Sequence, residues 1–324
     1  MHRSIDPLRG RRIAVLGYGS QGRAQARCLA DSGLDVVIGV RDGSRSRLNV
    51  ERDGLPVAGL KEACRGADLI AFMIPDREQP DVFETAVRPT LVNGATLLFA
   101  HGFNIRYERI HPPSDVDVVL VGPKAPGPML RAVFERGGGV PALIAVERDA
   151  SGEAWDRAYA YASGIGSDRA GIIRSTFAEE TETDLFGEQA VLAGGAGALV
   201  KAGFEVLVEA GYQPEVAYFE CVHELKLVVD LLAERGYAGL RRSISEVARH
   251  GSLTRGEMVI DGHVRRTMCK VLDDIRSGAY VEEWSAEADA GYPRIEAAVR
   301  EESQSLIERT GRAIRALTPS PEEK

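Results

Sequence analysis

The segment RRIAVLGYGSQG, residues 11–22, decides the fold of the N-terminal half of the chain. Residues 11–16, of which the last four are apolar, predict a buried strand, the glycines follow at once, and the alanine-rich residues 23–32 predict a helix. The glycines form the pattern G-x-G-x-x-G in the strand, turn and helix context of dinucleotide-binding proteins. Gly17 permits the tight turn, Gly19 lets a pyrophosphate approach, and Gly22 lets the helix pack closely on the strand. A purely structural turn is the alternative. We predict a dinucleotide-binding loop made of Gly17, Tyr18, Gly19, Ser20, Gln21 and Gly22.

The end of the next predicted strand, residues 35–40, indicates which dinucleotide binds. NAD-binding proteins usually place an Asp or Glu there to bind the ribose hydroxyls, but this chain continues with RDGSRSR, residues 41–47. Guanidinium and hydroxyl groups donate hydrogen bonds to phosphate oxygens, so the loop suits the 2'-phosphate of NADPH. We predict NADPH as the cofactor, with Arg41, Ser44 and Ser46 at the phosphate. Asp42 argues against this choice, and an exposed basic loop is the alternative.

The N-terminal half continues to alternate strands and helices, which predicts a Rossmann domain with a doubly wound parallel sheet. Further strands are predicted at residues 68–74, 95–100, 116–121 and 140–146, and a helix at 155–162. Ligands of such sheets bind at the carboxyl ends of the strands, where this chain has Asp76, His101, Lys124 and Gly127. We predict Asp76, His101 and Gly127 at the cofactor, and His101 and Lys124 in catalysis. A lone histidine is more often structural, and a lone lysine is usually a surface residue.

After about residue 175 the pattern becomes helical throughout, which predicts an all-α second domain. Besides the acidic segment around residue 184, helices are expected at residues 198–210, 215–232, 265–277 and 295–316. We predict a Rossmann domain at residues 1–174, a helical metal and substrate domain at 175–318, and a disordered Pro/Glu-rich tail at 319–324.

Two pairs of carboxylates lie in this helical half, Asp184 with Glu188 and Glu220 with Glu224. Residues four apart share one helix face, where like charges repel by roughly 0.2–0.5 kcal/mol, and by more if apolar neighbours bury them. A solvated helix face is the alternative for either pair alone. Carboxylate oxygens are ligands for hard divalent cations, so two such pairs could hold two magnesium ions and leave positions for substrate oxygens.

Composition limits the classes of function. The formal net charge of -8 and the absence of a basic block argue against nucleic acid or an anionic membrane as the main partner and favour a small metabolite. The four cysteines lie far apart, without a CxxC, so neither a zinc site nor a disulfide framework is indicated. The N-terminus lacks the apolar core of a signal peptide, and we expect no membrane span. A cytoplasmic protein is expected.

These motifs, in their order and spacing over nearly the whole chain, resemble ketol-acid reductoisomerase in its short, class I form. The resemblance is carried by GYGSQG at 17–22, HGFNI at 101–105, Pro123-Lys124, ETETDLFGEQ at 180–189, AGY at 210–212, YFE at 218–220, HELK at 223–226 and SIS at 243–245. It implies an N-terminal Rossmann domain, a knotted helical C-terminal domain and a homodimer with shared active sites. It also implies NADPH and two magnesium ions.

The resemblance further implies individual roles. Asp184 would bridge both ions, Glu188 would bind one ion and Glu220 the other, and Glu224 would act near the substrate and the second metal. Ser245 would hold the substrate carboxylate. The implied reaction is alkyl migration in a 2-hydroxy-2-alkyl-3-keto acid such as 2-acetolactate, followed by reduction to a 2,3-dihydroxy acid in branched-chain amino acid biosynthesis.

The chain departs from the family pattern at several positions, including the segment EVARH, residues 246–250, where the family usually has Asn/Asp-Thr-Ala-Glu-Tyr. Arg23 and Pro128 stand where histidine is usual, Arg106 stands where histidine is common, and Arg249 replaces glutamate. Two alternatives follow from these changes. One is a paralogue in specialised metabolism that reduces a different 2-keto or imino acid without isomerisation. The other is a non-catalytic NADPH-binding protein, which the retained carboxylates, His101 and Lys124 argue against.

Overall fold

The computed structural model describes residues 4–317 and divides into two compact units between Thr183 and Asp184, each described here by itself. This division falls inside helix α8 (Phe177–Phe186), whereas the sequence predicted a boundary after residue 174, which stays a prediction. The predicted tail, residues 319–324, lies outside the described residues.

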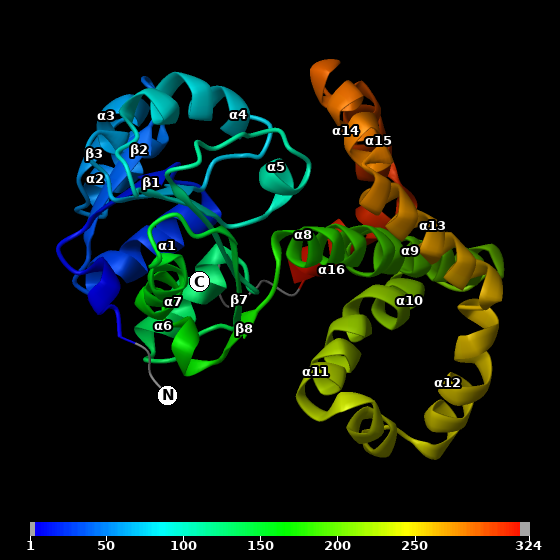
Figure 1. Ribbon diagram of the computed structural model, residues 1–324. Coiled ribbons are helices and arrows are strands. Elements are labelled where there is room, and N and C mark those ends of the chain that lie inside the picture. Colours follow the sequence, from blue (N-terminus) through cyan, green and yellow to red (C-terminus); the bar gives the residue numbers. More distant parts are fainter. Residues whose placement is uncertain (1–3, 318–324) are drawn as a thin grey trace. The chain divides into compact units, whose positions relative to one another are not determined.

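The first unit is built on one eight-stranded sheet with the order β3-β2-β1-β4-β5-β6-β7-β8 (Figure 1). The strands are β1 (Arg12–Leu16), β2 (Asp35–Val40), β3 (Val57–Gly59), β4 (Leu69–Phe72), β5 (Thr96–Phe99), β6 (Asp117–Pro123), β7 (Ala142–Arg148) and β8 (Ile172–Arg174). All neighbouring strands run parallel except β7, which is antiparallel to β6. The Rossmann-type domain predicted from the sequence is therefore confirmed, with two reversed strands, β7 and β8, at one edge of the sheet. Edge strands β3 and β8 escaped prediction because three residues are too few to show a period.

Helices cover both faces of the sheet, which explains why its strands read as continuous apolar runs. The helices of this unit are α1 (Ser20–Asp31), α2 (Ser46–Arg52), α3 (Leu60–Cys64), α4 (Gln79–Val82), α5 (Phe103–Arg106), α6 (Gly127–Glu135) and α7 (Ala154–Gly164). Successive residues of β1 alternate between two cores. Ile13 and Val15 join the cluster that contains Leu29 and Tyr161, whereas Ala14 and Leu16 join the cluster on the opposite face.

A buried carboxylate ties three elements of this unit together. The side chain of Asp117, at the start of β6, is fully buried and accepts hydrogen bonds from the backbone N–H groups of Ala150 and Ser151, at 2.9 Å each. Arg157 of α7 donates to its second oxygen at 3.2 Å. Thr96 of β5 also contacts that oxygen, at 3.3 Å. The contacts of Asp117 thus join strand β6, the loop at residues 150–151 and helix α7. They lie at the end of the sheet opposite the carboxyl ends of the parallel strands β1–β6.

The second unit consists of helices. They are the π-helical segments η5 (Gly187–Leu192) and η6 (Phe219–His223) and helices α9 (Gly194–Glu209), α10 (Pro214–Tyr218), α11 (Glu224–Ser243), α12 (Glu246–Val259), α13 (Gly262–Ser277), α14 (Ala279–Asp289), α15 (Pro293–Gln304) and α16 (Leu306–Leu317). The predicted helix at residues 295–316 is interrupted by Ser305, whose extended backbone ends α15 and whose hydroxyl accepts the N–H of Glu308 in α16. Helices α12 and α14 were not predicted.

The core of the second unit is small, and much of its apolar surface is open. Phe204, Ala217, Tyr218 and Ile314 form a buried cluster where α10 packs on α16. Gly311 is required there, because a Cβ atom would lie 2.7 Å from the Tyr218 ring. Large apolar side chains remain exposed on the helices around this cluster, including Leu199, Val206, Leu225, Leu227, Val228 and Val229.

One helical run contradicts the expectation that nothing approaches a membrane span. The consecutive helical segments Phe177–Glu209 are long and apolar enough to cross a membrane by length and composition, and only 6% of their most apolar window is buried. A single such run is weak support for a membrane segment. It also fits an apolar surface that a second protein chain covers.

Replacing Asp117 with asparagine should destabilise the first unit strongly. The amide would place an N–H group against Arg157 or the backbone donors and would leave the buried guanidinium with only the half-exposed Glu153 as its counter-charge. We expect the free energy of unfolding to fall by roughly 3–5 kcal/mol. Urea unfolding measures this, with Glu84→Gln, in an exposed pair with Arg88, as the control. Equal midpoints for the two variants would contradict the prediction.

Candidate functional site

The glycine-rich turn between β1 and α1 has the geometry of a phosphate loop. Gly17 has a φ of +97°, and a Cβ atom there would lie 2.7 Å from the Met73 carbonyl oxygen. A Cβ atom on Gly22 would lie 2.4 Å from the Gly17 carbonyl oxygen, so neither position accepts a side chain. Gly19 faces open space within 4 Å. A pyrophosphate would therefore have room beside Gly19, at the N-terminus of α1.

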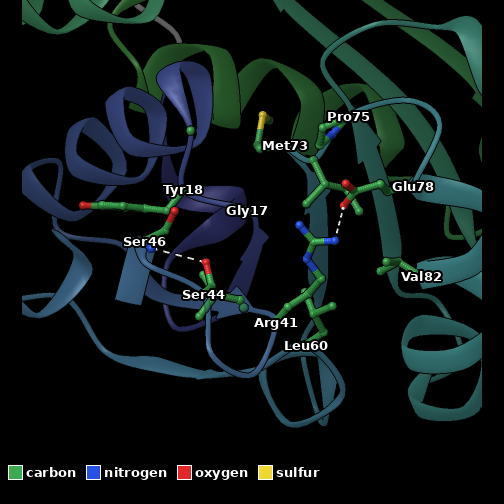
Figure 2. Close-up of a pocket in the computed structure, with 14 residues that line it drawn as sticks. Gly17, Tyr18, Arg41, Ser44, Ser46, Leu60, Met73, Pro75, Glu78 and Val82 are labelled. Atoms are coloured by element: carbon green, nitrogen blue, oxygen red, sulfur yellow. Dashed lines mark hydrogen bonds and ion pairs between the residues drawn. The ribbon is translucent and has the colours of Figure 1, made fainter. Parts of the chain in front are cut away.

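A pocket opens beside this turn, at the carboxyl ends of β1, β2 and β4 (Figure 2). Arg41, Ser44 and Ser46 line one side, and Glu78 lines the other. The Nη1 atom of Arg41 lies 3.3 Å from Oε2 of Glu78, so an ion pair spans the pocket. Asp42, which argued against NADPH in the sequence, is exposed and does not line it.

A second cluster lies at the ends of β5 and β6, around Glu180 of α8. One Glu180 oxygen lies 3.1 Å from His101 Nδ1 and accepts the backbone N–H of Gly102, also at 3.1 Å. Its other oxygen accepts a hydrogen bond from Lys124 Nζ at 3.1 Å. The Glu180 side chain is 1% exposed, whereas Lys124 is 37% exposed. The two predicted catalytic residues are therefore joined by one buried carboxylate.

Glu180 received no role in the sequence analysis, although its position carried a signal. It lies four residues before Asp184 and so extends the acidic spacing 180, 184, 188. Burial alone would raise the pKa of this carboxyl, but His101, Lys124 and the Gly102 N–H together hold the pKa below its ordinary value. Glu180 is therefore an anion in the folded protein at neutral pH.

Other predicted cofactor residues link the loops. Gln21 donates from Nε2 to the Ala125 carbonyl oxygen at 2.9 Å, which joins the glycine-rich turn to the loop after Lys124. Gly127 sits against the same turn, since a Cβ atom there would lie 2.1 Å from the Ser20 carbonyl oxygen. Asp76 accepts a hydrogen bond from Gln79 at 3.1 Å, and burial raises the pKa of its carboxyl.

Three of the departures from the family pattern have a local structural account. Arg23 forms a bidentate pair with Asp53, at 2.6 and 2.9 Å, and Arg106 pairs with Glu182 at 2.9 Å. Pro128 lies in the first turn of α6, where proline is favourable, and lines a groove between α1 and α6 together with Arg23. Arg249 lies on α12 and is exposed, and nothing in the structure explains its charge.

The carboxylate pairs lie on distorted helix. Glu188 belongs to π-helical segment η5 and Glu220 to π-helical segment η6, while Asp184 and Glu224 lie in the adjoining turns of α8 and α11. The i to i+5 hydrogen bonds of a π turn widen it, so the four-residue spacing does not have the regular α-helical geometry that the sequence suggested. Such turns occur frequently at functional sites. Segment η5 runs directly into α9, and segment η6 packs on α9.

Three of these acids are exposed in the single chain. Glu188, Glu220 and Glu224 are exposed, and the neighbouring Val191 and Phe219 are 49% and 43% exposed. Among the described residues, none forms an ion pair with these three glutamates. Burial raises the pKa of Tyr280 in α14, and the nearby carboxylates of Glu188 and Glu283 add to this effect.

Ser245, predicted to hold the substrate carboxylate, has a structural function in the single chain. It is exposed and is the N-cap of α12, where its Oγ accepts the Ala248 N–H at 3.2 Å. This cap satisfies one of the free N–H groups at the helix start. Its predicted contact with substrate stays a prediction.

The first unit combines a Rossmann-type sheet and a phosphate loop with a lysine and a histidine at its rim. The second unit is helical and carries paired carboxylates. Together these features define a dinucleotide-dependent oxidoreductase. Two family models match consecutive parts of the chain. Residues 7–171 match the NADPH-binding domain of acetohydroxy acid isomeroreductase, and residues 177–320 match the C-terminal domain of ketol-acid reductoisomerase. The chain belongs to the ketol-acid reductoisomerase family.

Individual relatives agree with this assignment. The chain is 55% identical over 310 residues to the ketol-acid reductoisomerase (NADP(+)) of Saccharopolyspora erythraea. The matched residues cover 96% of this chain and 93% of that protein. It is similar in structure to an NADH-preferring ketol-acid reductoisomerase from an uncultured archean, with a TM-score of 0.95, 42% identity and 98% of each chain covered. A putative oxidoreductase from Jannaschia sp. CCS1 shares the fold alone, with a TM-score of 0.62 and 17% identity over 82% of this chain and 97% of that one.

Replacing Glu180 with glutamine should reduce stability in a pH-dependent way. At pH 7 we expect a loss of about 1.5–3 kcal/mol, the worth of hydrogen bonds to a charged group. The folded-state pKa of Glu180 lies below the ordinary value of 4.5, so the carboxylate stabilises the fold above 4.5 and this contribution is lost as the pH falls through the lower folded-state pKa. Urea unfolding should therefore show the largest difference from wild type at neutral pH.

The exposed neighbour Glu179→Gln is the matched control for this substitution, and it should change the unfolding midpoint little at any pH. A difference between wild type and E180Q that grows on acidification would contradict the assigned charge of Glu180.

Proposed function

We propose that the protein is a magnesium-dependent, NADPH-using ketol-acid reductoisomerase. It would rearrange a 2-hydroxy-2-alkyl-3-keto acid such as 2-acetolactate and then reduce the product to a 2,3-dihydroxy acid. The observation that carries the proposal is the placement of both acid pairs at π-helical turns, in a chain whose other half anchors His101 and Lys124 on one buried carboxylate. Together these residues would serve both the rearrangement and the reduction.

The donor set of the second unit fits magnesium. Asp184, Glu188, Glu220 and Glu224 offer only carboxylate oxygens, which hard cations prefer, and the exposure of the three glutamates leaves their oxygens accessible. We propose that Asp184 is shared by two ions, with Glu188 at one, Glu220 at the other, and Glu224 near the substrate. When bound, the ions supply charge stabilisation for the oxygens of the substrate, and NADPH supplies the reducing equivalent.

The rim residues of the first unit would handle the proton and orient the substrate. Glu180 accepts at His101 Nδ1, so the neutral ring would carry its proton there, which places the lone pair of the ring on Nε2. A proton taken up at Nε2 would be stabilised by the anionic Glu180. Lys124, held by the same carboxylate, places an ammonium where it can donate to a developing alkoxide oxygen of the substrate.

The cofactor pocket supports NADPH over NADH. Arg41, Ser44 and Ser46 supply a guanidinium and two hydroxyls on one wall, a donor set that matches a phosphate group. Glu78 opposes them with one negative charge, which the ion pair with Arg41 offsets. The NADH preference printed for the archaeal relative belongs to that protein.

The remaining expectations are part of the proposal. A homodimer with shared active sites would cover the exposed apolar residues of the second unit and the run Phe177–Glu209. The knotted path of the chain and its cytoplasmic location are proposed from the family resemblance. Nucleic acid and membrane are not proposed as partners. The specialised paralogue and the non-catalytic protein are less well supported, because Arg23, Arg106 and Pro128 have local structural accounts and the carboxylates are retained.

Two substrates separate the half-reactions. With magnesium, we expect NADPH oxidation with both 2-acetolactate and its rearranged product, 3-hydroxy-3-methyl-2-oxobutanoate. Asp184→Asn should lower the kcat on 2-acetolactate by at least about 100-fold, because it weakens a ligand shared by both ions. NADPH absorbance measures both reactions, and Glu234→Gln, an exposed glutamate of α11, is the control.

Each pattern of activity has a defined meaning. Activity with the rearranged acid alone would favour the paralogue without isomerisation. Activity with neither acid would reject the proposed reaction, and an Asp184→Asn protein as active as wild type would reject the metal assignment.

Removing Arg41 should separate the two cofactors. Arg41→Ala deletes the only guanidinium that lines the described pocket, so the KM for NADPH should rise roughly 10- to 100-fold, while that for NADH changes less. Arg45→Ala is the matched control, because Arg45 lies in the same loop but does not line the pocket. Equal increases of KM for both cofactors would show that Arg41 does not bind the 2'-phosphate.

A further inference from the structure

Asp53, directly after α2, receives hydrogen bonds from two separate elements of the first unit. Tyr18 donates its hydroxyl to Oδ2 at 2.8 Å. Arg23 donates from Nε to the same oxygen at 2.6 Å and from Nη2 to Oδ1 at 2.9 Å. The Asp53 side chain is only 9% exposed. This is the geometry of a strong, charge-assisted contact rather than of a mobile surface pair.

The partners of Asp53 belong to the pyrophosphate loop. Tyr18 is the second residue of the glycine-rich turn, is 5% exposed, and lines the pocket of Figure 2. Arg23 lies in the first turns of α1, directly after the glycines. The backbone of Arg23 also donates to the Gly19 carbonyl oxygen at 3.0 Å. A carboxylate that fixes both side chains therefore fixes the turn between them.

Asp53 itself is the C-cap of α2, the helix that follows the loop with Arg41 and Ser44. Helix α2 begins at Ser46, which lines the pocket together with Arg41 and Ser44, and ends at Arg52. It is only seven residues long, so its own hydrogen bonds position it weakly. Val50 is its single fully buried residue, and Asp53 ties down its C-terminal end.

Electrostatic interactions keep the hydrogen bonds to Asp53 formed at neutral pH. The hydrogen bonds from Arg23 are the largest effect and lower the pKa of Asp53 to about 2. Burial and the bond to Asp53 raise the pKa of Tyr18. Tyr18 therefore stays the donor and Asp53 the acceptor, and the arrangement does not exchange roles when the solution pH changes in the physiological range.

From these contacts we infer that Asp53 is a positioning residue for the dinucleotide, which holds the 2'-phosphate loop at residues 41–46 in register with the pyrophosphate loop at residues 17–22. The inference rests on the proposed use of NADPH. It also gives a function to Arg23, which departs from the histidine usual in the family and supplies two of the three hydrogen bonds.

The connection should matter more for NADPH than for NADH. NADPH is held at both loops, so a change in their spacing strains one of its two phosphate contacts. NADH lacks the 2'-phosphate and needs only the pyrophosphate loop to be in place. A residue that merely stabilised the fold would affect both cofactors equally, and this difference separates the two roles.

The test is direct binding of each cofactor to the full-length protein by titration calorimetry, without turnover. Asp53→Asn should raise the Kd for NADPH about 10-fold and that for NADH less than about 3-fold. The kcat at saturating NADPH should change less than about 2-fold, because the reacting groups are untouched. Glu51→Gln, an exposed residue of the same helix, is the matched control and should change neither Kd.

A second variant keeps the test decisive if Asp53→Asn unfolds. Tyr18→Phe removes one hydroxyl and leaves the Arg23 pair, so it should raise the Kd for NADPH by about 3-fold and change that for NADH less. Equal weakening of NADPH and NADH, or unchanged Kd values, would overturn the inference while leaving the proposed function intact. Wild-type protein that binds NADPH no better than NADH would instead reject the proposed cofactor, and the inference with it.

Discussion

The burial of one carboxylate, Glu180, constrains the rim of the first unit. Removing an anion from water costs several kcal/mol unless hydrogen-bond donors replace the solvent. Here the donors come from the residues after β5 and from Lys124 after β6, so satisfying Glu180 requires both strand ends and helix α8 to meet at one point. The same requirement fixes the imidazole of His101. Stability and placement of the reactive groups thus depend on one set of contacts.

Glu180 belongs to a pattern, because two other poorly exposed carboxylates organise the same unit in the same way. Asp117 accepts hydrogen bonds from a loop and from Arg157 at the start of strand β6. Asp53 accepts hydrogen bonds from the glycine-rich turn and from α1 at the end of α2. Each joins segments that lie far apart in the sequence. Local backbone rules build the strands and helices, and these buried anions determine how the connecting loops are held.

The difference between local and distant constraints explains what the sequence could predict. The glycine-rich turn has a fixed local spacing of its glycines, so the positions of Gly17 and Gly22 identified it without a structure, although the atom that excludes a side chain at Gly17 belongs to the distant Met73. Asp53 lies 30 residues from Arg23, and Glu180 lies 79 from His101, and no local pattern links such partners. The π-helical turns were equally hidden, because the sequence of an acidic helix reads the same whether its hydrogen bonds span four residues or five.

The carboxylates of the second unit pose the opposite problem to Glu180. Their oxygens are accessible rather than enclosed, and apolar side chains such as Val191 and Phe219 beside them are also open. Electrostatic control of a reaction is strongest where water is excluded, and a helical unit with so small a core cannot exclude it alone. Covering the exposed apolar helices with a second copy of the chain would remove both difficulties at once. In the proposed dimer, therefore, association would complete the hydrophobic core and also create the low-dielectric surroundings in which the acid pairs can hold their ions.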